Sequence, residues 1–142
     1  MADLLDEGTR GQLLEILKEL PKTVRLIFFS QKPESPSCAQ QRAILQEIAE
    51  ISDKVRIERY DFVQDRDKAR KFGIDKIPAT AVVSDRDYGI RFFGLTMGYE
   101  FSSLVEAMIL VSTGQSGLPE DFSALVGRIR EPVHIEVMTT LT

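Results

Sequence analysis

Residues 24–38 read VRLIFFSQKPESPSC, and this stretch decides the fold. The run at residues 24–29 is too short for a helix and is rich in strand-forming residues, so it predicts a largely buried strand. A break follows at residues 31–34. Ser35 can then cap a helix, with Pro36 at the first helical position, where its missing N–H is harmless. The stretch therefore predicts a strand, a loop and a helix in that order.

The apolar spacing on both sides of this stretch predicts further elements. Further helices are expected over residues 13–20, 66–72 and 101–111, and further strands over residues 55–62, 77–83 and 90–94. A parallel β-α-β unit comes first and an antiparallel hairpin follows it. This order predicts an α/β fold with a central mixed four-stranded sheet and helices on both faces.

The last residues repeat the order in which the chain begins. A helix opened by Pro119 is followed by a strictly alternating strand over residues 133–138. A helix followed by a strand is also how the chain starts. The sequence therefore predicts a complete unit over residues 1–114, and the first helix and strand of a second unit over residues 115–142.

Composition limits the chemistry of the chain. It has 142 residues, 28% of them charged, a net charge of −4, one cysteine and one histidine. These counts exclude an internal disulfide and most metal sites, and there is no glycine-rich phosphate loop, so neither a metal nor a cofactor is expected. No basic run points to nucleic acid, and no apolar run of about 20 residues points to a membrane. Because the N-terminus is acidic and unlike a signal peptide, we expect a cytoplasmic protein with a reduced thiol.

The element order, the motif Ser35-Pro36-Ser37-Cys38 and the pair Ile77-Pro78 together resemble the thioredoxin/glutaredoxin fold. More narrowly, the chain resembles the N-terminal unit of tandem-thioredoxin proteins, which include the glutaredoxin-like protein disulfide oxidoreductases and the flavoprotein component of alkyl hydroperoxide reductase. The matching segments are residues 48–55, 77–80, 91–94 and 98–105. The resemblance implies a cis bond before Pro78, with Ile77 and Pro78 facing the Ser35–Cys38 turn and open to an extended peptide. The alternative is that Pro78 only shapes the turn into the next strand.

The chain departs from this family at its redox motif. The family usually carries C-x-x-C at the helix start, where this chain has Ser35 first and Cys38 last. Thr96 and Tyr99 also replace a proline and a histidine that are common there. Since an alcohol stays protonated near neutral pH, Ser35 cannot carry out thiol–disulfide exchange and is interpreted as a helix cap. Cys38 lies one turn deeper, where burial favours an inert thiol.

The predicted function is that of a redox-degenerate thioredoxin/glutaredoxin-like module, acting as a structural or docking N-terminal unit of a thiol–disulfide oxidoreductase system. The expected partners are a redox partner protein or an adjacent thioredoxin-like unit. The alternative is a monothiol glutaredoxin-like oxidoreductase in which Cys38 forms mixed disulfides with glutathione or a protein. The sequence leaves open whether the chain is an enzyme.

The last residues, 115–142, also lead to a prediction about how the chain associates. In the family, the redox-active C-x-x-C follows a strand like the one expected at residues 133–138, so the resemblance implies that the chain stops just before its neighbour's active site. An exposed strand there also allows a homodimer. His134, within this segment, is interpreted as a surface histidine and not as a metal ligand.

Overall fold

The computed structural model describes residues 3–140. Its helices are α1 (Glu7–Lys18), α2 (Pro36–Ile51), α3 (Arg66–Lys71), α4 (Tyr99–Thr113) and α5 (Glu120–Val126). Its strands are β1 (Val24–Ser30), β2 (Val55–Asp61), β3 (Ala79–Val83) and β4 (Arg91–Phe93). None of the helices in this part of the chain is long and apolar enough to cross a membrane.

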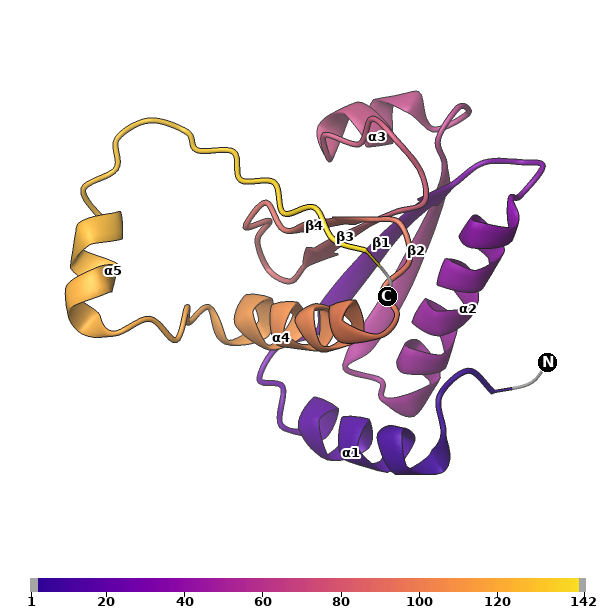
Figure 1. The fold of residues 1–142 in the computed structure, drawn as a ribbon, viewed down its shortest axis with the longest axis horizontal. Coiled ribbons are helices and arrows are strands. Elements are labelled where there is room, and N and C mark those ends of the chain that lie inside the picture. Colours follow the sequence, from indigo (N-terminus) through magenta and orange to yellow (C-terminus); the bar gives the residue numbers. More distant parts are fainter. Residues whose placement is uncertain (1–2, 141–142) are drawn as a thin grey trace.

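The strands form one mixed sheet in the order β2-β1-β3-β4. β1 pairs with β2 in parallel, from Val24 opposite Val55 onwards. β1 and β3 are antiparallel, and so are β3 and β4. The sheet has helices on both faces (Figure 1). The predicted fold, an α/β fold with a mixed four-stranded sheet, is confirmed.

Each face of β1 contributes to a separate apolar cluster, which explains its uninterrupted run of apolar residues. Leu26 and Phe28 lie in the larger cluster, which includes side chains of α1, α2 and α4. Ile27 and Phe29 lie in the smaller cluster with Ala69 of α3 and with Phe72. The short helix α3 is thus the cover of the second face, and it packs near the carboxyl end of β1.

The strand predicted over residues 133–138 is not formed. The segment has no ladder hydrogen bonds, and Ile135 and Val137 are each 81% exposed. Alternation predicts which side chains share a face, but a strand also needs a neighbour for its backbone groups. In the part of the chain that the structure describes, no strand pairs with this segment.

The helix predicted before that segment is present as α5. It spans seven residues, and none of them is buried. Figure 1 shows α5 standing away from the sheet, with the following residues running back toward it. Near the end of this tail, the hydroxyl of Thr139 donates to the carboxylate of Glu100 on α4.

Candidate functional site

The redox-like motif lies at the start of α2, where Ser35 is the N-cap. Its Oγ accepts a hydrogen bond from the backbone N–H of Cys38 at 3.2 Å, and Pro36 occupies the first helical turn. Ser35, Pro36 and Ser37 are exposed. The side chain of Ser35 is therefore used to satisfy one of the free N–H groups at the helix start.

Cys38 is the free cysteine of the chain, and it is 1% exposed. Its side chain is thus buried at the first turn of α2, whereas the three motif residues before it are exposed. Thiol–disulfide exchange requires a thiolate sulfur that can reach the sulfur of its target. In this conformation solvent reaches the hydroxyl group of Ser35 but not the thiol of Cys38.

A buried amide lies one turn beyond the motif. Gln41 is fully buried, and its Nε2 donates to Thr96 Oγ1 at 2.9 Å and to Thr80 Oγ1 at 3.3 Å. The backbone N–H of Thr96 donates to Gln41 Oε1 at 2.8 Å. Gln41 therefore ties the start of α2 to the start of β3 and to the loop after β4.

The sequence analysis did not identify Gln41 or this network. The available signals were an amide at an apolar position of the helical repeat, and Thr96 where the related family often has proline. A polar side chain in the core needs hydrogen-bond partners. Within the described residues every buried side-chain polar atom has one.

The segment before β3 holds Ile77 and Pro78. Their peptide bond is cis and Pro78 is buried. The carbonyl of Pro78 accepts from the N–H of Gly94 at 2.8 Å. Ile77, by contrast, has no hydrogen bond to its N–H or C=O from the residues that the structure describes. Thr80, two residues after Pro78, accepts a hydrogen bond from Gln41 of α2. The Ile77–Pro78 segment and the start of α2 therefore lie at the same end of the molecule.

The histidine considered in the sequence analysis lies elsewhere. His134 is in the exposed tail, with Nε2 2.8 Å from an oxygen of Glu136. No group of three or more potential metal ligands occurs in the part of the chain that the structure covers.

Comparison with known proteins identifies the relatives of this arrangement. No family model matches the sequence. The chain is 27% identical to the alkyl hydroperoxide reductase AhpF of Pseudomonas aeruginosa over 98% of its own length and 24% of that protein. It is 33% identical to the Escherichia coli protein of the same name over 75% of its own length and 18% of that protein.

A solved structure shows the same relationship in three dimensions. The NTD_N/C domain of the Enterococcus faecalis alkylhydroperoxide reductase superposes with a TM-score of 0.77 at 26% identity, over 84% of this chain and 58% of that one. The chain is a thioredoxin-like unit related to the N-terminal part of AhpF. It spans about a quarter or less of the curated relatives that it matches.

This relationship gives the geometry a meaning. The unit is thioredoxin-like, of the thiol–disulfide oxidoreductase kind, and has the fold of the N-terminal part of AhpF. The sequence resemblance implies a redox pair at the start of α2 in such proteins. In this chain, that place holds an exposed serine and a buried cysteine.

Proposed function

We propose that the chain is a structural or docking unit of a thiol–disulfide oxidoreductase system and does not itself exchange disulfides. The observation that supports this most directly is the position of Cys38, 1% exposed behind an exposed Ser35. Neither residue meets the needs of exchange, because one lacks a sulfur and the other lacks access to a disulfide. A single reduced thiol is in keeping with a cytoplasmic location, which is part of the proposal.

The docking role that we propose first is capture of an extended peptide at Ile77. Because the N–H and C=O of this residue have no partner among the described residues, they are available to an incoming main chain. Pairing of a backbone edge with an extended peptide supplies main-chain hydrogen bonds without any redox chemistry. Pro78 would hold this edge in place while its own carbonyl stays bonded to Gly94.

The second docking role concerns the tail. We propose that residues 1–114 are a complete thioredoxin-like unit and that residues 115–142 are the helix and strand that open a second one. Phe122, Ile135 and Met138 are 55%, 81% and 88% exposed. Apolar side chains of this size are normally covered by other protein. An adjacent thioredoxin-like unit is the proposed cover, and a second copy of the chain is the alternative.

Titration of the thiol tests the loss of exchange chemistry. Native protein is treated with an aromatic disulfide reagent at neutral pH, and the released thiolate is followed by absorbance. We expect no reaction of Cys38 on the time scale of an exposed thiol, and full reaction of the single cysteine after denaturation. The matched control is the double variant Ser37→Cys, Cys38→Ser, which moves the thiol by one residue to an exposed position and should react at an ordinary rate.

The competing proposal is a monothiol oxidoreductase that uses Cys38. It requires native Cys38 to react at least as fast as the thiol of the control variant. It also requires a mixed disulfide with glutathione to form in the native state, which mass spectrometry would detect as an adduct. Either result would overturn the proposal of a redox-inactive docking unit.

A further inference from the structure

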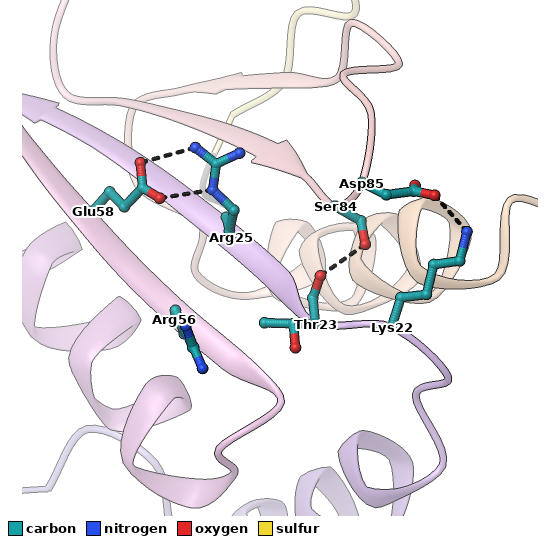
Figure 2. A pocket seen from close by; sticks show the side chains of 7 residues that line it. All are labelled: Lys22, Thr23, Arg25, Arg56, Glu58, Ser84 and Asp85. Atoms are coloured by element: carbon teal, nitrogen blue, oxygen red, sulfur yellow. Dashed lines mark hydrogen bonds and ion pairs between the residues drawn. The ribbon is translucent and has the colours of Figure 1, made fainter.

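A second surface, away from the motif, lies at the start of β1 and β2. It is a groove of about 580 Å³, and its walls include Lys22, Thr23, Arg25, Arg56, Glu58 and Asp85 (Figure 2). The groove is on the same face of the sheet as α3. That helix packs at the other, carboxyl end of β1, where the rings of Phe29 and Phe72 lie 6.3 Å apart. The groove therefore lies at the end of this sheet face away from α3.

The groove places two arginines side by side. Arg25 and Arg56 are register partners in the parallel pair of β1 and β2, so both side chains stand on the same face of the sheet. Like charges directly opposite one another on neighbouring strands are destabilising. Glu58 offsets this repulsion, because its carboxylate accepts from Arg25 Nε at 2.6 Å and from Arg25 Nη2 at 3.0 Å.

That pairing leaves Arg56 without a counter-charge. Arg56 is exposed and has no hydrogen bond or ion pair with any residue that the structure describes. On the other side of the groove, Lys22 pairs with Asp85, and half of each side chain is exposed. Figure 2 shows these two ion pairs flanking the groove, with Arg56 joined to neither. An exposed pair such as Lys22–Asp85 is weak, so Lys22 can turn to another anion at little cost.

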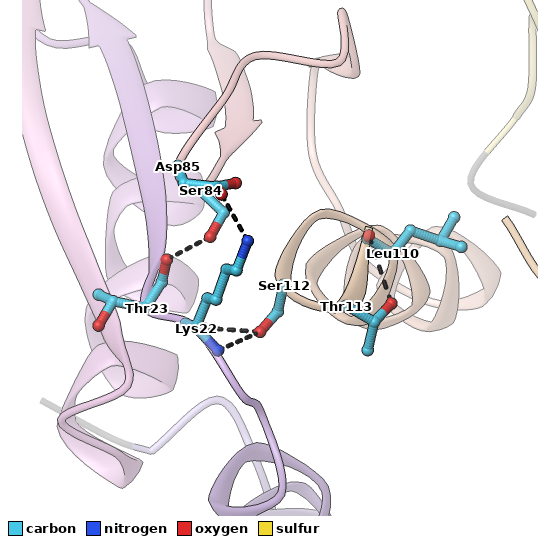
Figure 3. A network of polar contacts seen from close by, with 7 residues as sticks. All are labelled: Lys22, Thr23, Ser84, Asp85, Leu110, Ser112 and Thr113. Atoms are coloured by element: carbon cyan, nitrogen blue, oxygen red, sulfur yellow. Dashed lines mark hydrogen bonds and ion pairs between the residues drawn. The ribbon is translucent and has the colours of Figure 1, made fainter. Parts of the chain in front are cut away.

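The wall that carries Lys22 is held in place. The Oγ of Ser112 on α4 accepts from the N–H of Lys22 at 2.9 Å and donates to the carbonyl of Lys22 at 2.7 Å. Ser84 Oγ donates to the carbonyl of Thr23 at 2.7 Å. These bonds clamp the segment before β1 between α4 and the end of β3 (Figure 3). Little ordering is needed before a ligand binds.

We propose that this groove binds an acidic segment of a partner protein, with a side-chain carboxylate of that segment on Arg56. The mixed charge of the groove favours a peptide over a plain anion. A peptide brings carboxylates for Arg56 and Lys22, and main-chain N–H donors for the carboxylates of Glu58 and Asp85. The phosphate groups of a nucleic acid, or inorganic phosphate itself, present negatively charged oxygens and no main-chain N–H donors, so the carboxylates of Glu58 and Asp85 would repel them.

The test uses a fluorescein-labelled hexaglutamate peptide as the probe and anisotropy as the readout, at low and at physiological salt. The matched variants are Arg56→Glu and Arg59→Glu. Both arginines are exposed on β2 and both variants have the same net charge, but Arg59 is the register partner of Phe28 and lies on the opposite face. We expect Arg56→Glu to weaken binding more than tenfold and Arg59→Glu to leave it within twofold, because only the first reverses a charge in the groove. Backbone amide shifts induced by the probe should concentrate at residues 22–25 and 56–58.

Three results would overturn the proposal. Equal loss of binding in both variants would show unspecific attraction to positive charge. Amide shifts confined to residues 30–34 would place the probe in the groove that Arg59 lines with Lys32. Displacement of the probe by inorganic phosphate, at an ionic strength where sodium chloride leaves it bound, would make the site a simple anion site. None of these results bears on the state of Cys38, so the proposal stands or falls independently of the proposed function.

Discussion

Gln41 fills a position that the helical repeat of α2 gives to an apolar side chain. Its amide bonds Thr80 and Thr96, so one residue joins three segments that are distant in the sequence. Burying an amide is unfavourable unless its donors and acceptors are satisfied. The donors and acceptors of the Gln41 amide are satisfied here. Its hydrogen bonds therefore fix the position of α2, which carries Cys38, relative to β3, which follows Pro78.

Replacement of Gln41 by leucine tests this role. The variant keeps the approximate volume but leaves the N–H of Thr96 and the hydroxyls of Thr80 and Thr96 without their partner. We expect the free energy of unfolding to fall by about 2 kcal/mol, measured by urea denaturation. The control is Gln40→Leu, whose amide is only partly buried and makes one bond, to the sulfur of Met97. A loss within about 0.5 kcal/mol is expected there, and equal losses in both variants would contradict the role of the network.

At the scale of elements, the sequence predicts correctly those helices and strands that depend only on residues close together in the chain. The apolar run of β1 and the Ser35 cap of α2 depend on neighbouring residues, and both elements form where they are expected. The strand predicted over residues 133–138 does not form, because alternation cannot say whether a pairing partner is present. The buried network of Gln41 was missed for a similar reason, since its partners are 39 and 55 residues away.

The pair between β1 and β2 predicts a pH dependence of stability. The hydrogen bonds from Arg25 hold the pKa of the Glu58 carboxyl below its ordinary value of 4.5. A carboxyl with a lowered pKa in the folded state adds stability that is fully present above its ordinary pKa and is lost as the pH falls through the lowered one. The contribution is below about 1 kcal/mol because the pair is partly exposed.

Urea midpoints measured from neutral pH down to acid pH check this dependence. The difference between the wild type and Glu58→Gln should be largest at neutral pH and should shrink once the pH is below 4.5. The control is Glu106→Gln, an exposed carboxyl on α4 without a hydrogen bond in the described part of the chain. A difference for Glu58→Gln that stays constant across this range would contradict the role of the pair with Arg25.

At the scale of the whole molecule, we predict that the core (residues 1–114) and the tail (residues 115–142) are separable. All residues of both apolar clusters precede Gly114, and the last of them is Val111. Gly114 ends α4 in the left-handed region, with φ of 69°, where a residue with a side chain is strained. Beyond it, α5 buries no residue, and an isolated helix of this length is marginal in water. The tail therefore draws little stability from the core and gives little to it.

Truncation after Gly114 tests whether residues 1–114 fold as a unit and whether the tail carries the association surface. The truncated chain should unfold cooperatively with a urea midpoint close to that of the full chain, because it keeps both apolar clusters.

Sedimentation velocity over a range of concentrations should show association of the full chain but not of the truncated one, since the exposed apolar side chains of residues 118–138 are removed. A control with Ile135 and Val137 both changed to serine keeps the length of the tail and should also reduce association. Loss of cooperative unfolding on truncation would show that the tail is part of the folded unit, and a strictly monomeric full chain would rule out a second copy as the cover of the tail.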